Sequence, residues 1–217
     1  MKRYEAVIFD WDGTVMDSTH SIVAAIQGAC TDLALPVPSA SEASWVIGLS
    51  LQSALYHCVP TLTEERMDEF LDRYRFHFLS RDPHIKLFDG IAGLLLELRA
   101  SRVSLGVATG KSRVGLDRVL DAMQLRSHFD ATRCADESFS KPHPAMLLEL
   151  MEELGLEPDR VLMVGDTSHD IQMATAAGVD SMAVTYGAHE PSVLLAAEPT
   201  VVVGSVPEMR EWVLARV

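Results

Sequence analysis

Short apolar runs alternate with amphipathic stretches along most of the chain. The amphipathic stretches repeat apolar residues at helical spacing, which predicts helices at Ile91–Arg102, Arg113–Met123, Pro144–Leu154 and Asp170–Ala177. The apolar runs are rich in β-branched residues and predict strands at Ala6–Phe9, Val103–Ala108, Val161–Val164, Met182–Thr185 and Thr200–Val203, with a weaker one at Phe129–Cys134. Alternating strands and helices indicate an α/β fold: a doubly wound parallel sheet, or Rossmann-like core, covered on both faces.

One long segment breaks this alternation. Between about Asp17 and His84 the pattern is helical only, with predicted helices at Ile22–Leu35, Ser44–Cys58 and Glu64–Leu79. We therefore expect two domains: a core made of residues 1–16 and 85–217, and an all-helical domain, residues 17–84, inserted after the first strand.

Composition narrows the class of protein. The 217 residues are 48% hydrophobic, enough for one good core with a small satellite. A formal net charge of −13 argues against nucleic-acid and anionic-membrane binding, but it allows a small phosphorylated substrate. The three cysteines show no CxxC spacing, and no apolar stretch approaches the ~20 residues of a membrane span. We expect a soluble cytoplasmic protein.

Two carboxylates, Asp10 and Asp12, follow the first predicted strand and precede Gly13. Paired like charges at the end of a buried strand repel each other unless a cation lies between them. Hard carboxylate oxygens without nearby Cys or His favour Mg²⁺. The alternative interpretation is a pair of solvated turn aspartates, because Asp-Gly is a common turn signal.

Other polar groups follow the later strands. The carboxyl ends of parallel strands meet at one edge of the sheet, where ligands bind. Thr109 and Gly110 offer a hydroxyl and backbone amides suited to an anion, whereas Asp166 and Asp170 add two carboxylates and Lys141 adds a positive charge. Each has a simpler interpretation as well. Thr109 or Ser112 could cap a helix, Thr167 or Ser168 could cap the next one with Asp166 and Asp170 as acids favoured near its N-terminus, and Lys141 could be a solvated surface lysine. Lys111 is ambiguous.

Together these motifs resemble the haloacid dehalogenase-like hydrolase superfamily over nearly the whole chain. Asp10-Trp11-Asp12-Gly13-Thr14 resembles its first motif, Thr109 its second, Lys141-Pro142-His143-Pro144 its third and Gly165-Asp166-Thr167-Ser168-His169-Asp170 its fourth. The helical insertion resembles the C1-type cap of phosphoglycolate-phosphatase-like members. Trp11 departs from the usual Leu or Met between the two aspartates.

The resemblance implies a Mg²⁺-dependent phosphatase that hydrolyses a small, phosphoglycolate-like phosphate monoester through an aspartyl-phosphate intermediate. Asp10 would be the nucleophile and Asp12 the general acid and base. Asp10, the backbone carbonyl of Asp12, and Asp166 would hold Mg²⁺, with Asp170 behind them. The phosphoryl oxygens would bind Thr109, Gly110 and Lys141. Substrate choice would involve cap residues near Asp17–His20, Gly48–Ser50 and Arg73.

Several alternatives stay open at this point. A phosphomutase or a pyrophosphatase would use the same residues, and a non-catalytic binding protein would keep the same fold. A P-loop kinase is disfavoured because Gly106 and Gly110 enclose three residues, whereas the P-loop motif has four. A dehalogenase would leave Asp12 without a role. The oligomeric state is expected to be a monomer or a homodimer.

Overall fold

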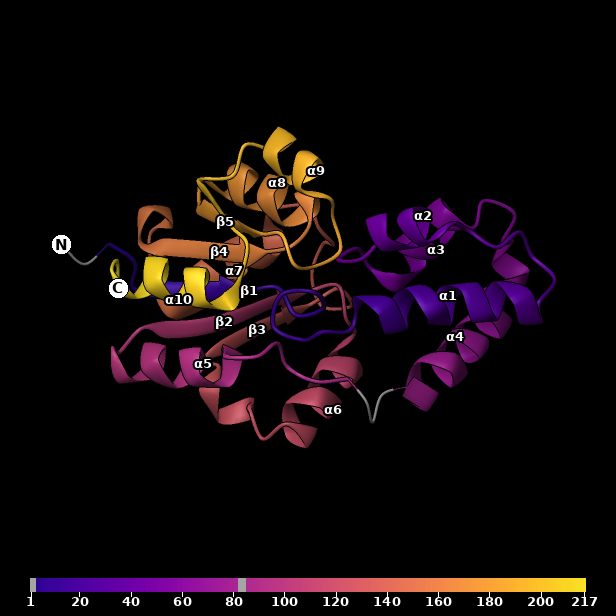
Figure 1. Cartoon of the computed structure of the whole chain (residues 1–217), viewed down its shortest axis with the longest axis horizontal. Coiled ribbons are helices and arrows are strands. Elements are labelled where there is room, and N and C mark those ends of the chain that lie inside the picture. Colours follow the sequence, from indigo (N-terminus) through magenta and orange to yellow (C-terminus); the bar gives the residue numbers. More distant parts are fainter. Residues whose placement is uncertain (1–2, 82–84) are drawn as a thin grey trace.

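The computed structural model describes residues 3–81 and 85–217 and contains a six-stranded, all-parallel sheet (Figure 1). The strand order is β3-β2-β1-β4-β5-β6. The strands are β1 (Ala6–Phe9), β2 (Ser104–Thr109), β3 (Ala131–Cys134), β4 (Val161–Gly165), β5 (Asp180–Val184) and β6 (Val201–Val203). Each strand that the hydrophobic pattern predicted is present, with its ends displaced by at most two residues.

Helices cover both faces of this sheet. The covering helices are α5 (Ile91–Ala100), α6 (Arg113–Ala122), α7 (Ala145–Leu154), α8 (Ser168–Ala177), α9 (Pro191–Ala196) and α10 (Val206–Leu214). Successive residues of β1 enter different cores: Val7 and Phe9 pack in the cluster that contains α5 and α10, whereas Ala6 and Ile8 pack in the cluster that contains α7 and α8. The predicted doubly wound fold is confirmed.

The strand order creates a crevice beside β1. From β1 the chain proceeds outward through β2 and β3, and it then returns to β4 on the other side of β1 before proceeding to β5 and β6. In such sheets, ligands bind outside the carboxyl ends of the strands at this change of direction. The polar residues that follow β1, β2 and β4 therefore meet at one place.

Between β1 and α5 the described chain contains helices only: α1 (Thr19–Asp32), α2 (Ala40–Trp45), α3 (Leu51–Cys58) and α4 (Met67–Arg81), with a short 3-10 helix at Glu64–Arg66. We call these residues, 17–81, the helical insertion. Figure 1 shows it to one side of the sheet, and α1 packs against α4. The segments that leave and re-enter the core run side by side, because the Asp17 amide donates to Lys86 O and the Phe88 amide to Val15 O.

The helical insertion differs from the prediction in its bounds and in one division. Helix α1 begins and ends three residues earlier than predicted, and the predicted helix Glu64–Leu79 is the 3-10 helix followed by α4. The expected single helix Ser44–Cys58 is two helices, α2 and α3. Gly48 between them has a φ of +92°, and the Ser50 side chain accepts a hydrogen bond from the Ser53 amide, which starts α3. The predicted boundary at residue 84 lies outside the described residues, and the division into two domains stays a prediction.

Two further 3-10 helices, Arg126–His128 and Pro158–Arg160, precede β3 and β4. The hydrophobic pattern did not single out α9 and α10, which are short. Within residues 3–81 and 85–217, none of the helices combines the length and apolar character that crossing a bilayer requires.

Candidate active site

Asp10 is the first residue beyond β1, and its side chain is buried at the bottom of the crevice. Its amide donates to Val164 O of β4 at 2.8 Å, which fixes the residue between the two central strands. Asp10 Oδ1 lies 2.5 Å from Lys141 Nζ, whereas Oδ2 is buried without a hydrogen-bond partner among the described residues. Burial raises the pKa of Asp10 to about 7, with Asp170 and Asp12 adding to the effect and Lys141 opposing it.

Lys141 is 2% exposed, so its interpretation as a solvated surface lysine is wrong. Its Nζ lies 2.5 Å from Asp10 Oδ1 and 2.6 Å from Asp170 Oδ1. Burial alone would lower the pKa of Lys141, but the two carboxylates raise it above its ordinary value. The side chain is therefore a permanent positive charge that joins the loop before α7 to the end of β1 and to the first turn of α8.

Three carboxylates gather around this ammonium group. Asp10, Asp166 and Asp170, here called the acidic cluster, each place an oxygen within 4.8 Å of the others, and all three are buried. Burial, together with Asp10 and Asp170, raises the pKa of Asp166 well above its ordinary range. One ammonium group does not balance three buried carboxylates, so the acidic cluster fits a divalent cation with oxygen ligands.

Two hydrogen bonds and the close packing of two glycines position the Asp166 side chain. Thr14 Oγ1 donates to Oδ1 at 2.8 Å, and the Ala188 amide donates to Oδ2 at 2.6 Å. A Cβ at Gly13 or at Gly187 would lie 2.1 or 2.2 Å from Oδ2. Gly13 also has a φ of +88°, which disfavours residues with a side chain. Both this backbone conformation and the closeness of Asp166 therefore require a glycine after the two aspartates.

Asp170 has two roles at once. Its Oδ2 accepts from the Thr167 amide at 3.0 Å and from Thr167 Oγ1 at 2.7 Å, which closes a capping box at the start of α8. Its Oδ1 faces Lys141. Its capping role is therefore confirmed, whereas its predicted role behind a metal ion stays a prediction. Helix α8 begins two residues earlier than predicted.

Asp12 points away from the acidic cluster. Its Oδ1 accepts from Ser18 Oγ at 2.6 Å, and its Oδ2 lies 2.9 Å from Lys111 Nζ. Sequence reasoning placed Asp12 at the site but left Lys111 ambiguous and missed its ion pair with Asp12. The available signal was the position of Lys111 directly after Thr109 and Gly110, at the same edge of the sheet.

A loop of the helical insertion packs directly on the turn after β2. Thr109 is buried, and its Oγ1 accepts from the Lys111 amide at 3.2 Å. A Cβ at Gly110 would lie 2.4 Å from Leu49 O and 2.6 Å from Gly48 O. The Ser50 amide donates to Ser140 Oγ at 2.8 Å in the loop that also carries Lys141. Residues 48–50 thus lie against two of the strand-end loops.

Gly110→Ala is expected to destabilise the protein by ~1–3 kcal/mol, because the new methyl group overlaps backbone carbonyls that have little room to move. Gly93→Ala is the control. A Cβ there meets nothing within 4 Å on α5, and alanine in a helix is favoured over glycine by about 0.5–1 kcal/mol. Urea unfolding of both variants measures the difference, and an unchanged midpoint for Gly110→Ala would show that residues 48–49 do not pack there in solution.

A second contact joins α2 to the core. The Trp45 carbonyl accepts from His169 Nε2 at 3.0 Å and from His189 Nε2 at 2.9 Å. His189 Nδ1 in turn accepts from the Ser168 amide at 3.0 Å, which makes its ring neutral with the proton on Nε2. Sequence reasoning missed these residues, because nothing in their spacing indicates that they meet.

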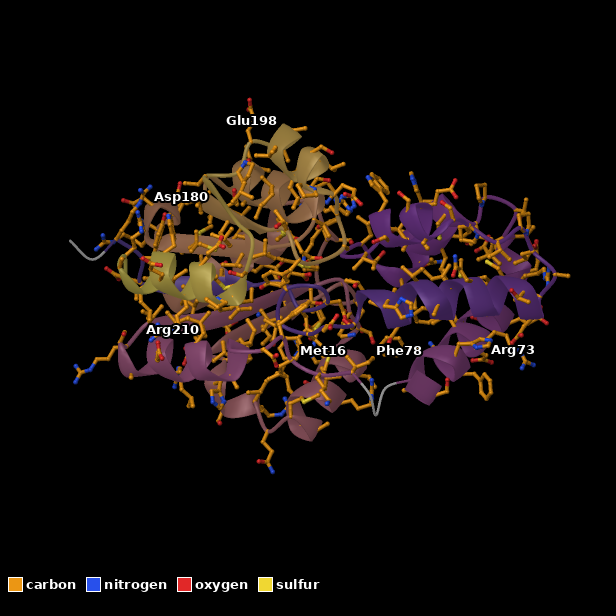
Figure 2. The ribbon with its side chains drawn as sticks, viewed as in Figure 1. Met16, Arg73, Phe78, Asp180, Glu198 and Arg210 are labelled. Carbon is orange, nitrogen blue, oxygen red and sulfur yellow. The ribbon has the colours of Figure 1, made fainter. Side chains whose placement is uncertain are left out.

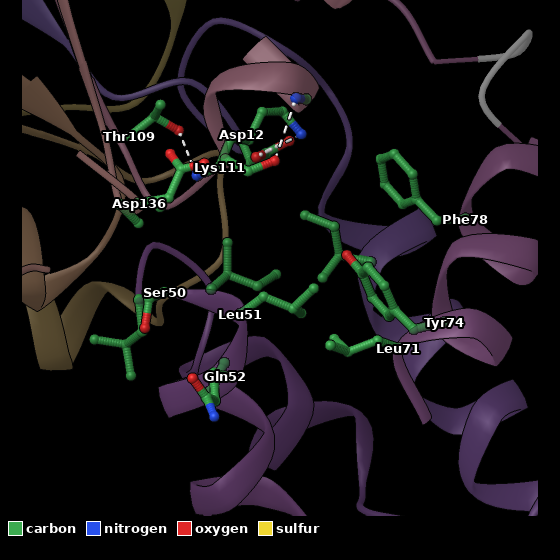
Figure 3. A pocket seen from close by; sticks show the side chains of 18 of the residues that line it. Asp12, Ser50, Leu51, Gln52, Leu71, Tyr74, Phe78, Thr109, Lys111 and Asp136 are labelled. Atoms are coloured by element: carbon green, nitrogen blue, oxygen red, sulfur yellow. Dashed lines mark hydrogen bonds and ion pairs between the residues drawn. The ribbon is translucent and has the colours of Figure 1, made fainter. Parts of the chain in front are cut away.

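The space between the strand ends and the helical insertion is a cavity of about 770 Å³ (Figure 3). Its lining on the core side includes Asp10, Asp12, Thr109, Gly110 and Lys111. On the other side it includes residues 48–50, which were predicted to matter, together with parts of α1, α3 and α4. Arg73 is exposed on α4 and is absent from the lining; Figure 2 shows it on the part of the helical insertion far from the sheet.

Comparisons with known proteins find relatives that match nearly the whole chain. A protein of Dickeya dadantii named "Probable phosphatase IndB" is 36% identical over 209 residues, which cover 94% of this chain and 90% of the relative. Tyrosine-protein kinase PtkA of Mycobacterium tuberculosis is 32% identical over 95% of this chain and 72% of its own length. Phosphoglycolate phosphatase of Salmonella typhi is 29% identical over 96% of this chain and 92% of its own length.

A solved structure shows the same fold from end to end. The crystal structure of a predicted phosphatase from Clostridium acetobutylicum superimposes with a TM-score of 0.86 at 28% identity, covering 99% of this chain and 100% of the other. Residues 7–184 match the family described as haloacid dehalogenase-like hydrolases, and this range contains all seven predicted site residues. The chain therefore belongs to the haloacid dehalogenase-like hydrolase family.

Proposed function

We propose that the protein is a Mg²⁺-dependent phosphatase that hydrolyses a small phosphate monoester through an aspartyl-phosphate on Asp10. The observation that carries the proposal is Asp10 Oδ2. Within the part of the chain that the structure describes, this oxygen is buried without a hydrogen-bond donor. It belongs to a residue that lines the cavity, and the other oxygen of the same carboxylate is held by Lys141. A carboxylate oriented in this way has one oxygen left for attack on phosphorus.

The acidic cluster fits Mg²⁺ in charge and in donor type. Asp10, Asp166 and the backbone carbonyl of Asp12 would hold the ion, and Asp170 would support it. When bound, Mg²⁺ would neutralise negative charge and polarise the phosphoryl oxygens. Thr109, Gly110 and Lys141 would contact the same oxygens as charge spreads over them.

The reaction would proceed in two transfers. In the first, Asp10 forms an O–P bond as the ester P–O bond breaks, and Asp12 gives its proton to the departing alkoxide. In the second, Asp12 takes a proton from water, the resulting hydroxide attacks phosphorus, and the bond to Asp10 breaks to release phosphate. Ser18 and Lys111, which hold the two oxygens of Asp12, would orient it for both transfers.

The helical insertion would act as the cap predicted for residues 17–84. Its loop at residues 48–50 lies over the turn of Thr109 and Gly110, where it would limit access of bulk water during the first transfer. Residence in the cytoplasm and a monomeric or homodimeric state stay predictions from the sequence.

The proposed function is tested with a panel of phosphate monoesters, sugar phosphates and pyrophosphate in the presence of Mg²⁺, by measuring released phosphate. ATP with a tyrosine-containing peptide belongs in the same panel, because one relative is named a tyrosine-protein kinase. Phosphate release from a monoester supports the proposal. Transfer to the peptide without release, or isomerisation of a sugar phosphate without release, would replace it with a kinase or a phosphomutase.

Asp166→Asn is expected to raise the Mg²⁺ concentration for half-maximal activity by at least ~10-fold, because even outer ligands of metal sites affect affinity by about 10–100-fold. EDTA should abolish wild-type activity, and added Mg²⁺ should restore it. Saturating Mg²⁺ should also stabilise the wild-type fold by ~2.7 kcal/mol at 100 times Kd, which thermal unfolding detects without turnover.

Asp68→Asn is the matched control for this experiment. Asp68 also lines the cavity, and the substitution makes the same change of charge, but Asp68 is exposed on α4 and lies outside the acidic cluster. Its Mg²⁺ titration should follow the wild type. Coinciding titrations for Asp166→Asn and the wild type would remove Asp166 from the metal site.

A further inference from the structure

The wall of the cavity that faces Asp12 is apolar. On α4, Tyr74 and Phe78 stack with ring centroids 5.9 Å apart and an interplanar angle of 14°, and Leu71 precedes Tyr74 by one turn. Ile22 and Ile26 of α1 and Leu51 of α3 extend the same surface. Figure 3 shows Leu51, Leu71, Tyr74 and Phe78 around one space, with Asp12 and Lys111 at its edge.

This wall lies next to the reacting groups. Lys111 Nζ, which is 2.9 Å from Asp12 Oδ2, is also 5.2 Å from the centroid of the Phe78 ring. A leaving group protonated by Asp12 would therefore extend from the phosphate toward α4. A cavity of about 770 Å³ falls within the range of ~300–1,000 Å³ typical of sites for drug-sized ligands, and it is far larger than a two-carbon ester needs.

Tyr74 adds one polar group to this surface. Among the described residues its hydroxyl has no hydrogen-bond partner, and Figure 3 shows it directed into the cavity. Burial and the nearby Asp12 raise the pKa of Tyr74 above its ordinary value, so the hydroxyl stays protonated. It offers one hydrogen bond to a ligand that covers the rings.

Apart from Asp10, which is assigned to the metal, the charged side chains of the described lining balance one another and give no surplus of cations to a second anionic group on the substrate. The described lining contains four acids, Asp10, Asp12, Asp68 and Asp136, against three cations, Lys111, Arg75 and Arg118. Lys111 is paired with Asp12, and Arg75 lies 3.3 Å from Asp72 with its side chain 61% exposed. A compact substrate such as phosphoglycolate would leave the apolar wall uncovered, and its carboxylate would lose hydration beside that wall.

We propose that the physiological substrate is a phosphate monoester whose alcohol carries an extended apolar or aromatic body, bound against Leu71, Tyr74 and Phe78. This inference rests on the proposed phosphatase function and names its substrate class. Each methylene of the alcohol that is buried against this wall should raise kcat/KM roughly three- to four-fold, because its burial stabilises the transition state.

The test is kcat/KM for a series of primary alkyl phosphates with Mg²⁺: ethyl, butyl, hexyl and 3-phenylpropyl phosphate, with phosphoglycolate beside them. The leaving alkoxides have similar basicity, so differences report contacts with the cavity. We expect kcat/KM to rise along the series and to be at least ~30-fold higher for 3-phenylpropyl than for ethyl phosphate. A flat series, or a preference for phosphoglycolate, would overturn the inference and leave the phosphatase proposal standing.

Variants on α4 test whether the apolar wall causes the preference for the larger alcohol. Phe78→Ala and Leu71→Ala should each reduce the ratio of 3-phenylpropyl to ethyl kcat/KM by ~5-fold or more. Phe76→Ala is the control, because Phe76 lies on the same helix, is 63% exposed and is absent from the lining. Leu71→Ala keeps the test usable if Phe78→Ala fails to fold, and ratios unchanged in both α4 variants would overturn the assignment.

A binding experiment tests the substrate class independently of turnover. If none of the esters is hydrolysed, the phosphatase proposal is contradicted, but the binding preference can still be measured. Calorimetric titration with Mg²⁺ compares propylphosphonate and 3-phenylpropylphosphonate, neither of which can be hydrolysed. At least ~10-fold tighter binding of the phenyl compound is expected from burial of one aromatic ring. Equal affinities would overturn the inference.

Discussion

Asp10→Asn is expected to reduce turnover by at least ~10⁴-fold, the scale seen when a catalytic nucleophile is removed. The amide is close in shape to the carboxylate, but it cannot form the acyl phosphate. The fold should survive, because Lys141 keeps its ion pair with Asp170 at 2.6 Å and the repulsion within the acidic cluster falls. Steady-state release of phosphate and a thermal unfolding curve measure the two effects.

A burst experiment separates the nucleophile from the acid. With 4-nitrophenyl phosphate the leaving group needs no proton, so Asp12→Asn should still release about one equivalent of nitrophenolate before it stops at the aspartyl-phosphate. Asp10→Asn should show no burst. Wild-type turnover by Asp10→Asn, or a burst from it, would exclude Asp10 as the nucleophile.

The core of the site was predictable because backbone topology determines it. Alternating apolar runs and amphipathic stretches indicate a parallel sheet, and such a sheet brings the residues after β1, β2 and β4 to one edge. Asp10, Thr109 and Asp166 follow directly from that rule. Lys141 was predicted at the same edge, but its burial between two carboxylates came only from the structure.

Individual contacts between distant segments were not predictable, either within the core or between the core and the helical insertion. The ion pair of Lys111 with Asp12, the approach of Leu49 O to Gly110, and the hydrogen bonds to the Trp45 carbonyl all join segments far apart in the chain. Helical periodicity shows which face of a helix is apolar, but not which surface that face meets. The break between α2 and α3 was missed for a related reason. Apolar residues continue through Val46–Leu49, and only the positive φ of Gly48 and the cap at Ser50 divide the pattern.

Lys141→Met is expected to cost ~3–5 kcal/mol of stability, as when one partner of a buried ion pair is removed. Because methionine fills much of the volume of lysine, the loss of stability measures mainly the missing charge. Asp10 and Asp170 would no longer have the Lys141 ammonium group, which lies 2.5 and 2.6 Å from their oxygens. Lys111→Met is the control. Lys111 pairs with one carboxylate rather than two, and each side chain of that pair keeps 11% of its area exposed, so its loss should cost less than the loss of Lys141.

Two further measurements distinguish a charge effect from a packing effect. Adding Asp170→Asn to Lys141→Met should recover part of the lost stability, because the double variant has one buried carboxylate fewer to leave unpaired. Mg²⁺ should stabilise Lys141→Met more than it stabilises the wild type, since the ion then supplies the only positive charge within the acidic cluster. Urea unfolding in EDTA and in Mg²⁺ measures both effects. If Lys141→Met and Lys111→Met lose the same stability, or if Mg²⁺ adds equally to all variants, then Lys141 is not what balances these carboxylates.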